Sequence, residues 1–70
     1  MASVKITFIG HASFRFESEK SVTYFDPWLD SNPTAKMTLA QVKKADIVIA
    51  SHGHRDHIGD SYEVCKKTKA

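Results

Sequence analysis

The sequence predicts a small α/β (α+β) domain whose elements follow in the order β-β-β-α-β-loop-α. Three observations support this class: alternating apolar and polar residues early in the chain, a continuous apolar run at residues 47–49, and two helix-start patterns in the second half. With 70 residues, the chain has room for one small domain at most. A hydrophobic content of 41% is ordinary for a globular protein and argues against a disordered tail.

The first half of the chain predicts three strands. Apolar and polar residues alternate over residues 4–8 and again over residues 13–17, as in half-buried strands. The polar run at residues 18–21 predicts a hairpin turn between the second strand and a third at residues 22–25, which is rich in β-branched and aromatic residues. Pro27 cannot donate to a strand ladder, so we expect the third strand to end before it.

The second half predicts a helix, a strand and a second helix. Residues 38–41 match a capping box that opens a short helix through Lys44. The apolar run at residues 47–49 is typical of a strand that is covered on both faces. Residues 60–63 form a second capping-box pattern, which predicts a helix through about Lys67.

A cluster of histidines follows the predicted strand at residues 47–49. His52, His54, Asp56 and His57 lie within six residues, and their imidazole nitrogens and carboxylate oxygens are ligands that zinc and similar divalent metals accept. His52 and His54 are two residues apart and can hold one metal, while a turn aims Asp56 and His57 at a second. Two alternatives are a surface loop that binds nothing and a structural zinc. The second alternative favours cysteine-rich sites, and this chain has one cysteine.

Charge and composition bear on the partners and the compartment. The net charge of +2 gives no argument for a nucleic-acid partner. The single cysteine, Cys65, rules out an internal disulfide and fits a reducing compartment. No apolar run approaches the length of a membrane span, so we expect no membrane association and a cytoplasmic location.

The histidine cluster resembles the metallo-β-lactamase superfamily. The cluster matches the H-x-H-x-D-H signature of that superfamily at every specified position. Residues 6–13 and 24–29 look more specifically like a branch of small metal-dependent hydrolases that is similar to the L-ascorbate-6-phosphate lactonase group. The resemblance spans the chain from Val4 to about Lys67.

The resemblance implies a fold larger than this chain. Members of the superfamily form a four-layer αββα sandwich and take further metal ligands from segments beyond the signature. We therefore expect residues 1–70 to be the N-terminal fragment of a single such domain. The remainder of the domain, or a second chain, would complete the site. An uncovered sheet edge also leaves a homo-oligomer open.

The resemblance also assigns roles to the metal ligands. His52 and His54 would hold the first metal, and Asp56 and His57 the second. Asp56 would also take a catalytic role by orienting the metal-bound hydroxide through a hydrogen bond. Two zinc ions are the expected cofactor, although the same ligands accept manganese, iron or nickel.

Two further residues are candidates for the surroundings of the metals. Asp26 would hold the metal loop by hydrogen bonds from outside the ligand set, although a turn-forming aspartate before Pro27 explains it equally well. His11 follows Gly10 at a strand end and would line the site, with a packing histidine as the equal alternative.

The function that follows is a metal-dependent hydrolase. One or two divalent metals would activate water against a small ester, lactone or phosphoester. A nuclease or phosphodiesterase of the same superfamily, an iron-dependent redox member, and a non-catalytic metal-binding fragment are the alternatives. The enzyme assignment applies to the parent protein, and the activity of the 70-residue chain by itself is left open.

Overall fold

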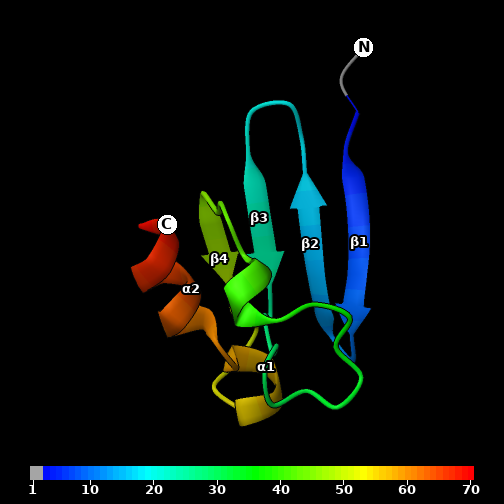
Figure 1. Ribbon diagram of the computed structural model, residues 1–70, viewed down its shortest axis with the longest axis vertical. Coiled ribbons are helices and arrows are strands. Elements are labelled where there is room, and N and C mark those ends of the chain that lie inside the picture. The colour runs from blue at the N-terminus through cyan, green and yellow to red at the C-terminus, as the bar shows by residue number, and fades with distance from the viewer. Residues whose placement is uncertain (1–2) are drawn as a thin grey trace.

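The computed structural model describes residues 3–70 and contains one mixed sheet together with short helices, one of which lies at an end of the strands (Figure 1). The elements are β1 (Lys5–Gly10), β2 (Ser13–Glu17), β3 (Val22–Phe25), the 3-10 helix η1 (Leu39–Gln41), β4 (Ile47–Ile49), α1 (Arg55–Ile58) and α2 (Ser61–Thr68). The strand order is β1-β2-β3-β4; β1, β2 and β3 are antiparallel neighbours, and β4 is parallel to β3. The predicted α/β class and the predicted order of strands are confirmed. Among residues 3–70, no helix is long and apolar enough to cross a membrane.

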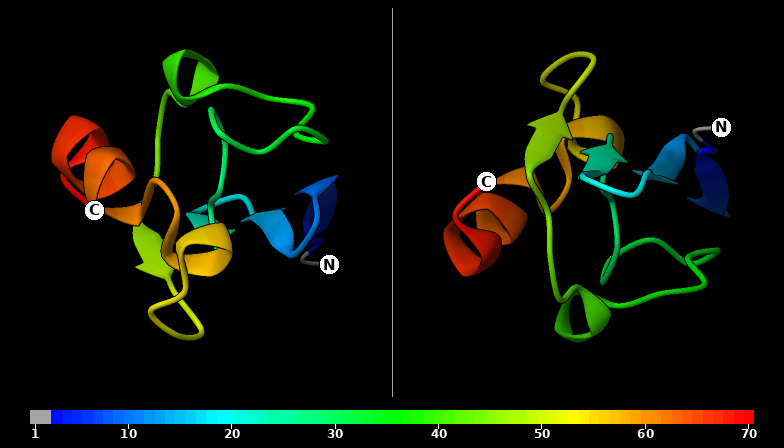
Figure 2. Two further views of the ribbon diagram at one scale, coloured as in Figure 1. Left: turned by 90° about the horizontal axis from the view of Figure 1, so that it is seen from below. Right: turned by 90° about the horizontal axis from the view of Figure 1, so that it is seen from above.

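The hydrophobic core lies on one face of this sheet. Its fully buried members come from strands, loops and α2, and they are Ile9, Tyr24, Leu29, Val42, Ala45 and Val64. Figure 2 shows η1 and α2 on this same side of the sheet. The long connection from β3 to β4 covers the face because the two strands are parallel and need a crossover.

The opposite face of the sheet is apolar and uncovered. The strand register places its side chains in two rows across the four strands, which are Ile6, Phe16, Thr23, Ile47 and Phe8, Phe14, Phe25, Ile49. Ile6 is 62% exposed and Ile47 is 51% exposed. The expectation that residues 47–49 are covered on both faces is therefore wrong for this chain, because only the side of Val48 meets the core.

Two helix predictions need correction. Only η1 forms where a helix through Lys44 was expected, because Val42 adopts an extended backbone (φ −72°, ψ 117°) that buries its side chain completely in the core. The predicted capping box between Thr38 and Gln41 is present, and in it the Thr38 N–H donates to Gln41 Oε1 at 2.9 Å. The second predicted box is absent: Asp60 precedes α2 but its side chain makes no cap bond.

The Asp60 carboxylate instead ties α2 to the segment after β3. Its Oδ2 accepts hydrogen bonds from the Leu29 N–H at 2.8 Å and the Asp30 N–H at 3.2 Å. The backbone N–H of Asp60 donates to the Pro27 carbonyl at 2.8 Å. These contacts fix the start of α2, and with it the end of α1, against residues 27–30.

Candidate metal centre

Three strand ends meet at one edge of the sheet. β1 and β3 are both antiparallel to β2, and β4 is parallel to β3, so β1, β3 and β4 all end at the edge where α1 lies (Figure 1). His11 directly follows β1, Asp26 directly follows β3, and Ser51 follows β4 after one intervening residue. The sheet therefore brings together three positions that are far apart in the sequence. Ligands of open α/β sheets bind at this kind of edge.

Asp26 is the buried centre of a hydrogen-bond network. Its side chain is 1% exposed, and its backbone is left-handed with φ 46°. Oδ1 accepts the Ser51 N–H at 2.6 Å, while Oδ2 accepts the Ser51 hydroxyl at 2.7 Å and His57 Nδ1–H at 2.8 Å. Burial by itself would raise the pKa of Asp26, but the hydrogen bonds from His57 and Ser51 outweigh it and hold the pKa below its ordinary value.

His57 is oriented by this network. Its Nδ1 is occupied by Asp26, so its Nε2 points toward Asp56 and lies 3.8 Å from Asp56 Oδ2. In neutral imidazole, a proton on Nδ1 leaves the lone pair on Nε2. The contact therefore selects the tautomer in which Nε2 can bind a metal, as a carboxylate does for many metal-bound histidines.

His11 reaches the same place from the β1–β2 turn. Its Nε2 lies 3.0 Å from Asp56 Oδ2, and its ring contacts the His57 ring edge-on with a centroid distance of 5.3 Å. His11, Asp56 and His57 each offer one ligand atom, and these atoms all lie within 4.8 Å of one another. Loss of hydration alone would raise the pKa of Asp56, yet the neighbouring imidazoles of His57 and His11 hold that pKa below its ordinary value.

His52 and His54 lie on the exposed side of this group. The His52 ring lies 4.6 Å from the His54 ring and 4.1 Å from the His57 ring, measured between centroids. Ser51 Oγ lies 2.9 Å from His52 Nδ1. Because that hydroxyl donates its hydrogen to Asp26, it can only accept from His52 Nδ1–H, which leaves His52 Nε2 free for a metal.

Two features of this region differ from the sequence analysis. The segment expected as a loop after the strand contains one helical turn, α1, which carries Asp56 and His57 and begins after His54. Ser51 was not among the predicted site residues, although it joins Asp26 to His52. Its position immediately before the signature was the signal available in the sequence.

Gly59 lets α1 pack against the segment after β3. Its φ is 42°, and a Cβ built on it would lie 2.6 Å from the Trp28 Cα and 2.7 Å from the Pro27 carbonyl oxygen. No side chain fits between these backbones. Gly59 therefore sets how closely Asp56 and His57 approach the end of β3.

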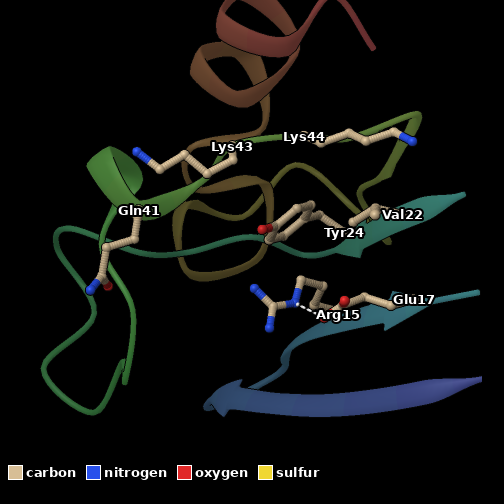
Figure 3. Close-up of a pocket in the computed structure, with 7 residues that line it drawn as sticks. All are labelled: Arg15, Glu17, Val22, Tyr24, Gln41, Lys43 and Lys44. Atoms are coloured by element: carbon tan, nitrogen blue, oxygen red, sulfur yellow. Dashed lines mark ion pairs between the residues drawn. The ribbon is translucent and has the colours of Figure 1, made fainter.

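A separate pocket lies on the core side of the sheet, between β2, β3 and the segment after η1 (Figure 3). Its volume is about 170 Å³, and it is lined by Arg15, Glu17, Val22, Tyr24, Gln41, Lys43 and Lys44. None of the predicted site residues contributes to it. The Arg15 guanidinium is already paired within the pocket, with Nε 2.7 Å from Glu17 Oε1.

The comparisons with known proteins agree with the geometry. The sequence pattern of the family described as "Beta-lactamase superfamily domain" matches residues 5–64. The chain belongs to this superfamily. The predicted family is thus confirmed, and the match includes every residue of the histidine cluster.

Relatives of this superfamily chain carry the name metal-dependent hydrolase. A UPF0173 metal-dependent hydrolase from Koribacter versatilis is 46% identical over 68 residues, which cover 96% of this chain and 29% of the relative. One from Methanosarcina barkeri is 42% identical over 69 residues, covering 99% of this chain and 29% of the relative. The chain thus spans less than a third of the length of these relatives.

A solved structure shows the same arrangement of elements. Igni18, described as a novel metallo hydrolase from the hyperthermophilic archaeon Ignicoccus hospitalis, is 38% identical and superposes with a TM-score of 0.87. The superposition covers 100% of this chain and 30% of Igni18. The family match over residues 5–64 and the structural match to a metallo hydrolase therefore agree.

Proposed function

We propose that this chain carries the metal-binding half of the active site of a metal-dependent hydrolase. The observation that carries the proposal is the contact between the buried Asp26 carboxylate and His57 Nδ1, at 2.8 Å. It leaves His57 Nε2 free, beside the carboxylate of Asp56. A surface histidine without a ligand has no need of a buried carboxylate that fixes its tautomer. The donor set therefore fits a divalent metal.

The chain's own residues would divide between holding the metals and orienting water. His52 and His54 would hold the first metal, and Asp56 and His57 the second. A bound divalent metal supplies water with a pKa near ~7 and polarises the substrate oxygen. Asp56 would act as the catalytic residue by accepting a hydrogen bond from that water and aiming it at the substrate.

Asp26 would act as a positioning residue. It holds His57 directly and His52 through the Ser51 hydroxyl, so one buried carboxylate orients an imidazole of each metal pair. The alternative of a simple turn-forming aspartate does not account for these three contacts. These contacts favour Asp26 as a residue that holds the metal-binding histidines over Asp26 as a residue that only forms a turn.

The chemistry of the ligand set supports a proposal for the metal, the substrate class and the partners. We infer two zinc ions, with manganese, iron or nickel as competing occupants of the same nitrogen and oxygen ligands. The substrate would be a small ester, lactone or phosphoester in the cytoplasm. A catalytic zinc has three protein ligands, so the pair His52 and His54 requires a ligand from the remainder of the domain or from a second chain.

Metal stoichiometry measured together with hydrolysis tests the proposal. The purified chain is titrated with Zn²⁺ by calorimetry and assayed with a nitrophenyl ester, a lactone and a nitrophenyl phosphodiester. We expect metal binding that is lost in the His57→Ala variant and kept in a Tyr62→Ala control, because Tyr62 is 70% exposed on α2.

The outcomes separate the candidate functions. Binding with hydrolysis of the ester or lactone supports the proposed enzyme, and preference for the phosphodiester supports the nuclease or phosphodiesterase alternative. Binding without any turnover supports the metal centre, and the same assay on the chain together with the remainder of the domain then separates a half-site, which gains turnover, from a non-catalytic fragment, which does not. Absence of Zn²⁺ binding at micromolar protein contradicts the proposal.

A further inference from the structure

We propose that His11 is a direct metal ligand, which completes a three-residue site with Asp56 and His57 inside this chain. The inference rests on the proposed function, because it concerns the same metal centre. It goes further in assigning a ligand that lies outside the H-x-H-x-D-H signature.

The distances fit a shared metal ion. His11 Nε2 lies 3.0 Å from Asp56 Oδ2, and His57 Nε2 lies 3.8 Å from that same oxygen. Metal–ligand bonds of about 2.0–2.2 Å place the ligand atoms of a tetrahedral site roughly 3.4 Å apart. The observed separations lie on either side of this value. A bound metal would take the place of the proton that His11 now shares with Asp56.

The number of ligands fits as well. Among the described residues, His11 joins Asp56 and His57 as a third group whose ligand atom lies within 4.8 Å of theirs. Three protein ligands and a fourth position for water or substrate are the usual set of a catalytic zinc. His11 and Asp56 are each 42% exposed, so a fourth position toward solvent stays accessible.

The backbone of the β1–β2 turn is shaped to deliver His11. His11 has φ 59°, a left-handed conformation that non-glycine residues rarely adopt. Gly10 precedes it with φ 151°, and a Cβ on Gly10 would lie 2.8 Å from the Thr34 carbonyl oxygen. The turn is also fixed from the other side, because Asn32 Nδ2 donates to the Gly10 carbonyl at 3.2 Å.

Stability does not explain this strained turn. An exposed pair such as His11 and Asp56 contributes little in solvent, less than a left-handed non-glycine residue costs. Trp28 restricts the imidazole further, since its ring meets the His11 ring edge-on at 5.4 Å between centroids. A strained residue held in one orientation beside two ligand atoms is typical of a functional position.

The test observes the bond between His11 and the metal directly. The chain is labelled with ¹⁵N-histidine and loaded with ¹¹³Cd²⁺, a zinc substitute with nuclear spin one half. We expect a one-bond ¹¹³Cd–¹⁵N splitting at His11 Nε2 and at His57 Nε2. A His11 that only hydrogen-bonds to Asp56 shows no splitting while His57 does.

A variant provides the second measurement. His11→Asn keeps a residue that tolerates the left-handed backbone but is too short to place a nitrogen at the metal. We expect its Zn²⁺ affinity to fall by about 100-fold or more, above the 10–100-fold loss typical of outer contacts. The matched control is Lys69→Asn, which makes the same change at another left-handed position (φ 64°) at the end of α2.

The outcomes distinguish this inference from the proposed function. Splitting at His11 together with the affinity loss establishes the ligand. Splitting at His57 without splitting at His11, or equal affinity in the His11→Asn variant, overturns the inference and leaves the proposed metal centre intact. A chain that binds no Cd²⁺ or Zn²⁺ overturns both.

Discussion

Replacement of Asp26 by asparagine tests whether one buried carboxylate sets the metal-binding state of His57. The change is isosteric, so it removes the charge without creating a cavity. Asparagine can still accept the Ser51 N–H through its amide oxygen. Its NH₂ group, however, then faces Ser51 Oγ and His57 Nδ1, both of which now donate to the carboxylate. His57 must move its proton to Nε2 to accept from that NH₂, and this tautomer has no lone pair for the metal.

The magnitude follows from the bonds that are replaced. Two hydrogen bonds to a charged group are worth about 1.5–3 kcal/mol each, and the neutral bonds that replace them return about 1 kcal/mol each. The net loss for Asp26→Asn is thus about 1–4 kcal/mol. A chain of this length has a total unfolding free energy of about 3.5–10 kcal/mol, so the change is a large fraction of it. Metal affinity should fall by about 10–100-fold, as for other partners of metal-bound histidines.

Urea unfolding and Zn²⁺ calorimetry measure the two effects separately. The single tryptophan, Trp28, reports unfolding by fluorescence because it is packed beside the site. Asp30→Asn is the matched control, since Asp30 is exposed and its Oδ1 accepts the Leu39 N–H, a bond that asparagine keeps. The control should change stability by less than about 0.5 kcal/mol. If Asp26→Asn loses stability but binds Zn²⁺ as tightly as before, the tautomer argument is refuted.

The same carboxylate gives the metal-free chain a pH signature. The folded pKa of Asp26 lies below its ordinary value of 3.8. A lowered folded pKa contributes stability above the unfolded pKa, and this contribution is lost as pH falls through the folded one. Unfolding free energy should therefore fall below about pH 4. The slope of unfolding free energy against pH in this range should be shallower in Asp26→Asn. Equal slopes in the two proteins would contradict the lowered pKa of Asp26.

Two further predictions concern packing. Gly59→Ala should lower the free energy of unfolding by more than about 2 kcal/mol, because the new Cβ would lie 2.6 Å from the Trp28 Cα at a residue with positive φ. Gly53→Ala is the control, since its Cβ would meet nothing within 4 Å, and it should be near neutral in urea unfolding. The double variant Ile6→Thr, Ile47→Thr removes apolar surface from residues that are 62% and 51% exposed. It should leave the urea midpoint of unfolding nearly unchanged and reduce self-association in sedimentation. Unchanged self-association would show that this face does not mediate contacts between copies of the chain.

Local patterns predicted the strands well because the information that sets them is local. The alternation over residues 4–8 and 13–17 and the polar turn at residues 18–21 lie within a few residues of the strands that they define. The Ser18 N–H closes that turn on the Ser21 carbonyl at 2.9 Å. The alternation does not reveal which face of the sheet packs against the core. Ile6 and Phe8 face away from the core.

The predictions of the helix ends failed where tertiary contacts compete with local ones. Residues 38–44 match a helix start, but burial of Val42 draws the chain out of the helix after one turn. The Asp60 side chain could have capped α2, but its Oδ2 instead accepts a hydrogen bond from the Leu29 N–H at 2.8 Å. Residue spacing alone reveals neither the core that buries Val42 nor the Leu29 N–H that binds Asp60, because only the fold brings these groups together.

The same limit explains which parts of the candidate metal centre were predictable. The signature residues lie together in the sequence, so they could be named as candidate ligands before the fold. The contact between His11 and Asp56 joins residues 45 positions apart, and it depends on two strands, β1 and β4, that are not neighbours in the sheet. Sequence analysis could name His11 as a candidate but could not place its Nε2 at the carboxylate of Asp56.

The backbone of the two residues that follow β1 and β3 connects the fold to this chemistry. His11 and Asp26 both have positive φ, at 59° and 46°, and both lie at the sheet edge that carries the histidine cluster. From these two positions, His11 contacts Asp56 at 3.0 Å and Asp26 contacts His57 at 2.8 Å. Residues that break local preference in this way tend to be retained for function. The positive φ values of His11 and Asp26 therefore favour the proposed site at this edge on grounds that do not depend on the signature.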